Sequence, residues 1–344
     1  MRSRCGLVTL GLLAIAAGAG SAVATGGRSA AGLSQSLAVE ESRSGAASPH
    51  LLPLLDRLAG AQLDNGALTA AASSRRRALR IALRSYGGRS TDTANAMVAL
   101  ARVELLRHRY VEAEPLLVAA LPALEARFGA DSPALAGPLA GLARVAVAHG
   151  ELAAAQSWAD RATAIAARHP SSVSSEPLRA LGAVYAAQER FGDGEKVLRA
   201  ALARDQARGG AGFETARSLA QLANLLLRAK RFDEALPLIE EAVAIDQQQL
   251  GPTHPLIADD FTDLGLIYAG VGRDAAAGVA LFYALDLLDL GAAEETPRVA
   301  YVELGLAPVL RRLGHADDAK AAFDDAKRIL DAAAKDERKQ ERQI

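Results

Sequence analysis

The sequence predicts an all-α protein, a solenoid of about seven helical hairpins, and three observations support this. A leucine followed by a small residue recurs about every 42 residues. Within each repeat, apolar residues follow helical spacing on two consecutive segments, which predicts two helices. A Ser-Pro, Thr-Pro or His-Pro pair recurs at the boundaries between repeats. A fixed period of this kind indicates stacked repeats, because one hairpin cannot bury its own apolar face.

Residues 219–255 show the pattern most fully. Four leucines at helical spacing give the first helix one apolar side: Leu219, Leu222, Leu225 and Leu226. Asp233 and Glu234 open a second helix, where the helix dipole favours acidic side chains. Gly251 can adopt the left-handed conformation that ends a helix, and Pro252 prevents its continuation. This segment is therefore predicted to form one helical hairpin whose second helix ends at Gly251.

Aligning the repeats on this hairpin defines a leucine and three small residues in each. The leucines are Leu58, Leu100, Leu142, Leu181, Leu222, Leu264 and Leu306. The positions 1, 13 and 20 residues after each leucine all hold Ala or Gly, as in Ala223, Ala235 and Ala242. The repeats cover 49–90, 91–132, 133–174, 175–213, 214–255, 256–297 and 298–334. Gly194 replaces Ala in the fourth repeat, and Pro308 predicts a kink or a looser seventh repeat.

These residues resemble the tetratricopeptide repeats, in the longer form found in kinesin light chains. In the fifth repeat the resemblance rests on Leu222, Ala223, Phe232, Ala235 and Ala242, and in the second on Leu100, Ala101, Tyr110, Ala113 and Ala120. The segments RYVEAEPLLVAAL (109–121) and LGPTHP (250–255) also look like that form. The resemblance covers about 51–334. It implies an α-α superhelix in which the first helix of each hairpin lines an inner groove.

The chain before the repeats divides into two segments. Residues 1–24 have the pattern of a secretory signal peptide, with Arg2 and Arg4, an apolar stretch at 5–17, and small residues at 22–24. This predicts a periplasmic or secreted protein, cleaved after Ala24; the alternative is an uncleaved, N-terminally membrane-anchored protein. Residues 25–48 predict a flexible lead-in with a short helix at 33–42. At the other end, residues 335–344 predict a charged extension of the last helix.

Composition limits the partners. The formal net charge is −1, which gives no attraction to nucleic acid or to an anionic membrane surface. No second hydrophobic segment follows the first, so no membrane span is predicted after signal cleavage. Cys5 is the one cysteine and lies within the signal segment, so disulfides do not stabilise the predicted exported chain.

The sequence does not predict an enzyme, and it predicts no catalytic, cofactor-binding or metal-binding residues. Its six histidines lack metal-ligand spacing such as H-E-x-x-H, and no G-x-S-x-G motif occurs. The GGAG stretch at 209–212 follows no predicted strand, so its context does not fit a nucleotide-binding loop. Helical hairpins take up 51–334, which leaves no segment for a catalytic domain.

The predicted function is an exported scaffold that binds a protein or an extended peptide in the bacterial cell envelope. One alternative is a small-molecule-binding module in which Tyr185, Tyr268, Tyr283 and Tyr301 contribute; these tyrosines can equally pack between helices. Another alternative is a structural protein that self-assembles through the ends of its solenoid. The repeat pattern alone is compatible with all three functions, because fold does not imply function.

The resemblance also places candidate partner-binding residues on the inner groove. They are Asn95, Arg102, Arg144, Arg179, Arg217, Asn224 and Arg228. Arginine offers a planar fork for carboxylates, and asparagine can pair with the backbone of an extended peptide. We therefore expect an acidic segment or a free C-terminal carboxylate as the ligand, although arginines of a helical protein also serve simply as solvated surface groups.

Overall fold

The computed structural model describes residues 29–291 and 297–341. The predicted signal peptide at 1–24 lies outside the described residues, as do Thr296 and the last three residues of the chain. The described residues form α-helices joined by turns and short 3-10 segments, with no strand among them. Within that described part, no helix has both the length and the apolar character needed to cross a bilayer.

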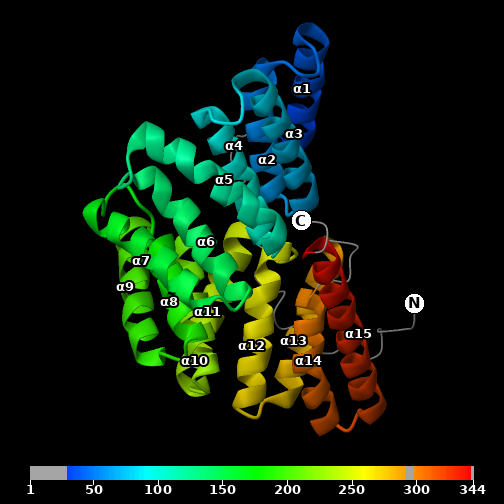
Figure 1. The fold of residues 1–344 in the computed structure, drawn as a ribbon. Helices are drawn as coiled ribbons and strands as arrows, with labels where there is room; N and C mark the ends of the chain where they lie inside the picture. Colours follow the sequence, from blue (N-terminus) through cyan, green and yellow to red (C-terminus); the bar gives the residue numbers. More distant parts are fainter. Residues whose placement is uncertain (1–28, 292–296, 342–344) are drawn as a thin grey trace. The chain divides into compact units, whose positions relative to one another are not determined.

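The described chain forms two compact units, an N-terminal unit that ends at Leu250 and a C-terminal unit that begins at Gly251. The helices of the N-terminal unit are α1 (Ala30–Ser44), α2 (Leu52–Asp64), α3 (Leu68–Tyr86), α4 (Thr91–Leu106), α5 (Tyr110–Phe128), α6 (Ala136–Ala148), α7 (Leu152–Arg168), α8 (Glu176–Ala187), α9 (Phe191–Gly209), α10 (Phe213–Arg228) and α11 (Phe232–Leu250). Those of the C-terminal unit are α12 (Ala258–Gly270), α13 (Asp274–Gly291), α14 (Pro297–Arg312) and α15 (Ala316–Glu341). They are labelled in Figure 1.

The helices from α2 onward pair in sequence into the predicted hairpins, from α2–α3 to α14–α15. The leucine that defines each repeat lies on the first helix of its pair, and each is at most 7% exposed. The three small positions that follow it are buried in every repeat. The repeat register predicted from the sequence is therefore confirmed. α15 continues to Glu341, so the last helix extends into the predicted charged extension.

Close packing explains the glycines that replace alanine at small positions, as two of the three show. A Cβ atom on Gly194 would overlap the side chain of Leu225 in the next hairpin. A Cβ atom on Gly265 would lie 2.6 Å from Cγ of Leu281. Gly194 thus leaves room for the side chain of Leu225 and does not loosen the fourth repeat.

Each hairpin turn contains one residue in the left-handed conformation, eight positions after the repeat leucine. In four turns this residue is a glycine, such as Gly150 with φ 76°. In the other three it is His108, Glu189 or Lys230, with φ between 56° and 60°. A side chain in this region is uncommon because Cβ crowds the backbone. In these three hairpins, the packing that requires this turn therefore outweighs the conformational cost of a left-handed residue with a side chain.

At three of the boundaries between repeats, the residue before the proline caps the helical segment that follows. The side chains of Ser48, Ser132 and His254 accept hydrogen bonds, at 3.2–3.3 Å, from the backbone N–H two residues further on. The proline that follows each cap opens one 3-10 turn before the α-helix begins. Because proline lacks an N–H, it loses no hydrogen bond at a helix start.

Two expectations from the sequence need correction. Residues 25–48 are not simply a flexible lead-in, because α1 spans Ala30–Ser44 and buries Leu33 and Leu37 against α2 and α3. Ser29 caps this helix by accepting a hydrogen bond of 3.2 Å from the N–H of Gly32. The short helix expected at 33–42 is present and extends further at both ends, and packing on α2 and α3 stabilises it more than helix propensity does.

The expected looser seventh repeat is also not seen. α14 is continuous through Pro308, and the residues on either side of it, Ala307 and Val309, are buried. Pro308 itself is exposed. A ring on the exposed side of a helix loses one backbone hydrogen bond without disturbing the packed side.

Arginines connect successive hairpins through ion pairs that reach back to the preceding repeat. Arg161 pairs with Glu125 at 2.5 Å, and Arg231 with Glu195 at 2.6 Å. In the C-terminal unit, Arg312 pairs with Asp274 and Arg298 with Asp259, both at 2.7 Å. The Arg312 guanidinium lowers the pKa of the Asp274 carboxyl from its usual value through a hydrogen bond.

The register makes a direct prediction about stability. Ala113 is fully buried where α4 and α5 approach each other, so Ala113→Leu should overpack the contact and cost about 1–3 kcal/mol of unfolding free energy. Glu241→Leu adds apolar bulk at an exposed position of α11 and should change stability by less than about 0.5 kcal/mol. Urea denaturation followed by circular dichroism measures both. Equal effects of the two substitutions would contradict the register.

Candidate partner-binding surface

The predicted groove residues all lie on first helices of the N-terminal unit. Asn95 and Arg102 are on α4, Arg144 on α6, Arg179 on α8, and Arg217, Asn224 and Arg228 on α10. Neighbouring first helices pack directly, because α8 contacts both α6 and α10, and α6 contacts α4. The structure therefore brings these helices together as one layer.

The side chains differ widely in accessibility. Asn95, Arg102 and Arg228 are exposed, and Arg144, Arg217 and Asn224 are half-buried. Spacings of seven and eleven residues return a helix to nearly the same side, so Arg217, Asn224 and Arg228 follow one side of α10. Asn95 and Arg102 follow one side of α4 in the same way. Six of the seven predicted residues can be reached from solvent.

The seventh, Arg179, is a correction. It is 3% exposed, and its guanidinium donates hydrogen bonds to Asp205 at 2.9 Å and to Glu214 at 2.5 Å. Ser218 lies 3.4 Å from the same guanidinium and donates to Asp205 at 2.6 Å. Arg179 thus links α8, α9 and α10 and is not available to a partner.

One sequence signal could have revealed this network. Asp205 occupies the position 24 residues after the repeat leucine, which holds buried apolar residues in other hairpins, such as Leu124 and Leu288. A carboxylate at a core position requires a buried counter-charge, because an unpaired buried charge is strongly unfavourable. Arg179 is that counter-charge.

Arg144 and Arg217 form the basic centre of the surface. Burial lowers the pKa of the Arg217 guanidinium from its usual value, and the charges of Arg144 and Arg179 lower it further. Glu176 and Glu214 act in the opposite direction. The two arginines therefore lie close enough to repel each other, and within the described residues neither forms an ion pair. Two neighbouring arginines that form no ion pair favour the binding of an anion.

An aromatic residue that the sequence analysis missed supports Arg217. Its guanidinium lies over the ring of Phe213, 5.5 Å from the centroid, one helical turn earlier in α10. Such contacts are attractive and restrict the orientation of the side chain. The i, i+4 spacing of Phe213 and Arg217 was the available signal.

Three of the four tyrosines contact neighbouring side chains of the fold. Tyr185 lies under Arg190 at 4.3 Å, and Tyr283 packs on Phe261 and donates to the carbonyl of Pro252 at 2.8 Å. Tyr268 lies near Arg273, whereas Tyr301 is 53% exposed. These contacts give no support to a tyrosine-lined ligand cavity. In the described ranges, no cluster of His, Cys, Asp or Glu is suited to a metal ion.

Residues 174–248 and 214–277 match the sequence model of the tetratricopeptide repeat. Together the two matches run from the fourth hairpin into the sixth. The same register continues through the hairpins on both sides of this region. Residues 174–277 are tetratricopeptide repeats. The predicted fold class, an all-α tetratricopeptide solenoid, is confirmed. Proteins of this class bind peptides or proteins and are typically non-enzymatic, so the fold supports a scaffold for protein–protein interaction.

Several solved structures resemble this tetratricopeptide chain. A Rap protein complexed with Competence and Sporulation Factor is 11% identical, with a TM-score of 0.51, and the match covers 83% of this chain and 99% of that one. A putative kinesin light chain repeat structure from Podosopora anserina is 20% identical, with a TM-score of 0.43 over 58% and 96%. Pseudomonas aeruginosa pilF is 19% identical, with a TM-score of 0.43 over 69% and 92%. At these identities the likeness concerns the fold alone. No curated protein matches the chain.

The buried network yields a prediction about stability. Arg179→Met should cost about 3–5 kcal/mol of unfolding free energy, because it leaves the Asp205 carboxylate buried without its partner. Arg179→Met combined with Asp205→Leu should recover most of that loss. Urea unfolding measures both variants.

Arg144→Met provides the control, because it removes a half-buried arginine that has no ion pair in the described part of the chain. Its effect on stability should be within about 0.5 kcal/mol. If Arg179→Met were as mild as Arg144→Met, the structural role of Arg179 would be refuted.

Proposed function

We propose that this tetratricopeptide protein is an exported scaffold of the bacterial cell envelope that binds an acidic segment of a partner through α6 and α10. The observation that carries this proposal is the pair Arg144 and Arg217, whose charges act on each other and which form no ion pair among the described residues, although Glu176 and Glu214 also act on Arg217. A peptide carboxylate is a suitable ligand, because each guanidinium can donate two parallel hydrogen bonds to it.

The side of α10 that continues from Arg217 suits the remainder of such a peptide. Asn224 and Arg228 lie about two and about three helical turns further along the same side. An asparagine amide can pair with a peptide backbone, and Arg228 is exposed for a second acidic residue. Asn95 and Arg102 offer the same two functional groups on α4. An extended, acidic ligand is therefore favoured over a compact one.

Precedent for complexes on this fold comes from the similar structures. The Rap protein is described as complexed with Competence and Sporulation Factor. That complex is a property of the Rap protein. For the present chain, the choice of an acidic peptide rests on Arg144 and Arg217.

Charge reversal tests the proposed surface. Arg144→Glu combined with Arg217→Glu should weaken binding of a fluorescein-labelled hexaglutamate peptide by at least roughly tenfold, because two attractive charges become repulsive. It should also reduce the dependence of binding on salt, since fewer charges are screened. Fluorescence anisotropy at low and physiological salt measures both effects.

Arg80→Glu combined with Arg84→Glu is the matched control. These arginines are exposed on the second helix α3, and the substitutions change the net charge equally. If this control weakened binding as much as the α6/α10 variant, the attraction would be a general charge effect. If neither variant changed binding, the partner site would lie elsewhere.

Export is the second part of the proposal. Arg2 and Arg4, the apolar stretch at 5–17 and the Ala22–Val23–Ala24 sequence support cleavage after Ala24. N-terminal mass spectrometry of the native protein should therefore find Thr25 as its first residue, in the periplasmic or secreted fraction. An intact N-terminus at Met1 in the membrane fraction would instead establish an N-terminal anchor.

A further inference from the structure

α1 has the register of a second helix, although no first helix precedes it in the described part of the chain. It ends at Gly45, whose φ of 89° matches that of Gly87 and Gly129, which stand 42 and 84 residues later after α3 and α5. In all three places the N–H of the serine three residues further on donates to the glycine carbonyl, at 3.1–3.4 Å. The loop after α1 is therefore the same loop that follows the second helix of a complete repeat.

The contacts of α1 with the next hairpin repeat in the same way. Arg77 of α3 pairs with Glu41 of α1 at 2.7 Å and donates to the carbonyl of Ala46 at 3.3 Å. Arg161 of α7 makes the same two contacts with α5 and its loop, to Glu125 at 2.5 Å and to the carbonyl of Ala130 at 3.3 Å. Each residue of the first set precedes its counterpart by 84 positions, which is two periods.

In a complete hairpin, the other side of the second helix is covered by its own first helix. Ile329 of α15, for example, clusters with Ala300 of α14. Four of its six counterparts in other repeats are also buried, at 6% exposure or less, namely Ile81, Ile165, Ile245 and Leu287, whereas Ala123 and Arg204 are half-buried. In α1 this position is Val39, and it is 46% exposed. Ser36, which stands at a small position that is alanine and buried in all seven repeats, is half-buried.

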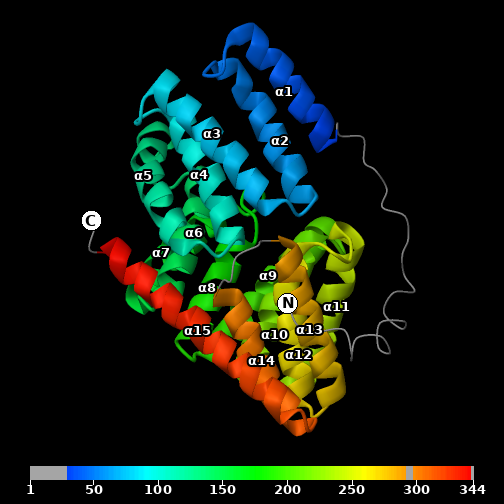
Figure 2. The ribbon, with the colours of Figure 1, turned by 90° about the vertical axis from the view of Figure 1, so that its right-hand side faces the viewer.

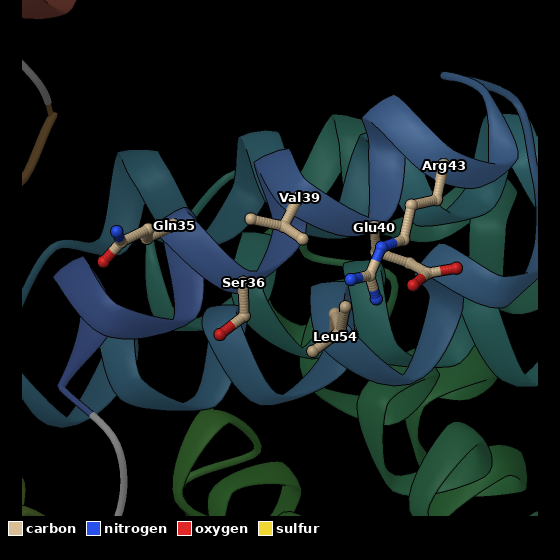
Figure 3. Close-up of a pocket in the computed structure, with 6 residues that line it drawn as sticks. All are labelled: Gln35, Ser36, Val39, Glu40, Arg43 and Leu54. Carbon is tan, nitrogen blue, oxygen red and sulfur yellow. The ribbon is translucent and has the colours of Figure 1, made fainter.

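An open hollow of about 400 Å³ occupies this uncovered side of α1. It is lined by Gln35, Ser36, Val39, Glu40 and Arg43 of α1 and by Leu54 of α2. Figure 3 shows the five α1 side chains along the helix, with Leu54 beside them. Figures 1 and 2 both show α1 beside α2, so this helix has a neighbour on one side.

We propose that this hollow binds one amphipathic α-helix of a partner protein. That helix takes the place of the first helix in the repeat whose second helix is α1. The occupant is a helix because each of the seven complete hairpins covers this position with a single antiparallel helix. It needs a small residue opposite Ser36 and apolar residues toward Val39 and Leu54. This site lies on α1, apart from Arg144 and Arg217, and goes beyond the proposed function.

Charges at the hollow define the occupant further. The side chains of Glu40 and Arg43 have no ion-pair partner among the residues described. Both lie near the C-terminal end of α1, where an antiparallel occupant begins. The first turn of the occupant therefore carries an acidic residue toward Arg43, which the helix dipole also favours, and a basic residue toward Glu40.

A second copy of this chain does not fit the requirement. Every first helix in the described ranges already lies against its own second helix. Lending one to another molecule would expose the apolar side of a complete hairpin, at a cost in buried area that the exchange would not recover. Of a second copy and a different protein, the proposal therefore commits to a helix of a different protein.

A synthetic peptide with the sequence of α4, TDTANAMVALARVELL, is the probe. It has the Leu100–Ala101 pair of a first helix and Asp92 in its first turn. It should bind the purified protein with a Kd of about 0.1–1 mM. The affinity is low because the isolated peptide must first form a helix. Fluorescence anisotropy measures the affinity, and hydrogen exchange should locate the protected amides in α1.

Val39→Asp in the protein should weaken binding at least roughly tenfold. Ala38→Asp is the matched control, because Ala38 is exposed on α1 and does not line the hollow, and it should leave binding unchanged. Both variants should keep the helical content of the parent protein.

Three results would overturn the proposal. One is no binding of the α4 peptide up to about 1 mM, and another is equal binding by both variants. The third is a dimer, seen by light scattering, that Val39→Asp dissociates, because the occupant would then be a second copy.

Discussion

The two helices of each hairpin can pack together only because they meet at residues that have little or no side chain. A Cβ atom added to Gly265 would lie 3.2 Å from the carbonyl of Ala277 on the facing helix, so even one methyl group nearly touches the opposite backbone. Alanine or glycine is therefore required at three positions in every repeat. The large side chains, such as Leu281, fill the space on either side of this contact. The rest of the fold depends on that spacing between helices.

The same constraint explains why the repeat register could be predicted from the sequence. Whether a residue fits between two backbones depends on its size alone, and size can be seen in the sequence. The helix α1 could be predicted less well. Its apolar contacts depend on Leu33 and Leu37, which lie within a polar, serine-rich stretch. These two leucines fit the repeat pattern only when the 42-residue period is extended upstream of the first complete hairpin.

The sequence predicts where the candidate residues stand on their helices. It does not predict which side chains they meet in space. Arg144 stands two residues after its repeat leucine, whereas Arg217 stands five before its own. They approach each other because α6 and α10 both pack on α8. Arg179 has an equally suitable position in the sequence, yet it turns to Asp205, a carboxylate that lies on another helix. Whether an arginine stays accessible or becomes structural thus depends on the nearest acid in space.

The ion pairs between hairpins have a consequence for how the chain folds. Arg161 and Glu125, like Arg231 and Glu195, are 36 residues apart, and each pair joins a hairpin only to the one before it. Contacts of this kind keep the relative contact order low, and low contact order is associated with fast folding. Any internal hairpin can serve as a nucleus on which its neighbours form. During synthesis, a hairpin therefore needs only the preceding repeat, and not the end of the chain, to find its partners.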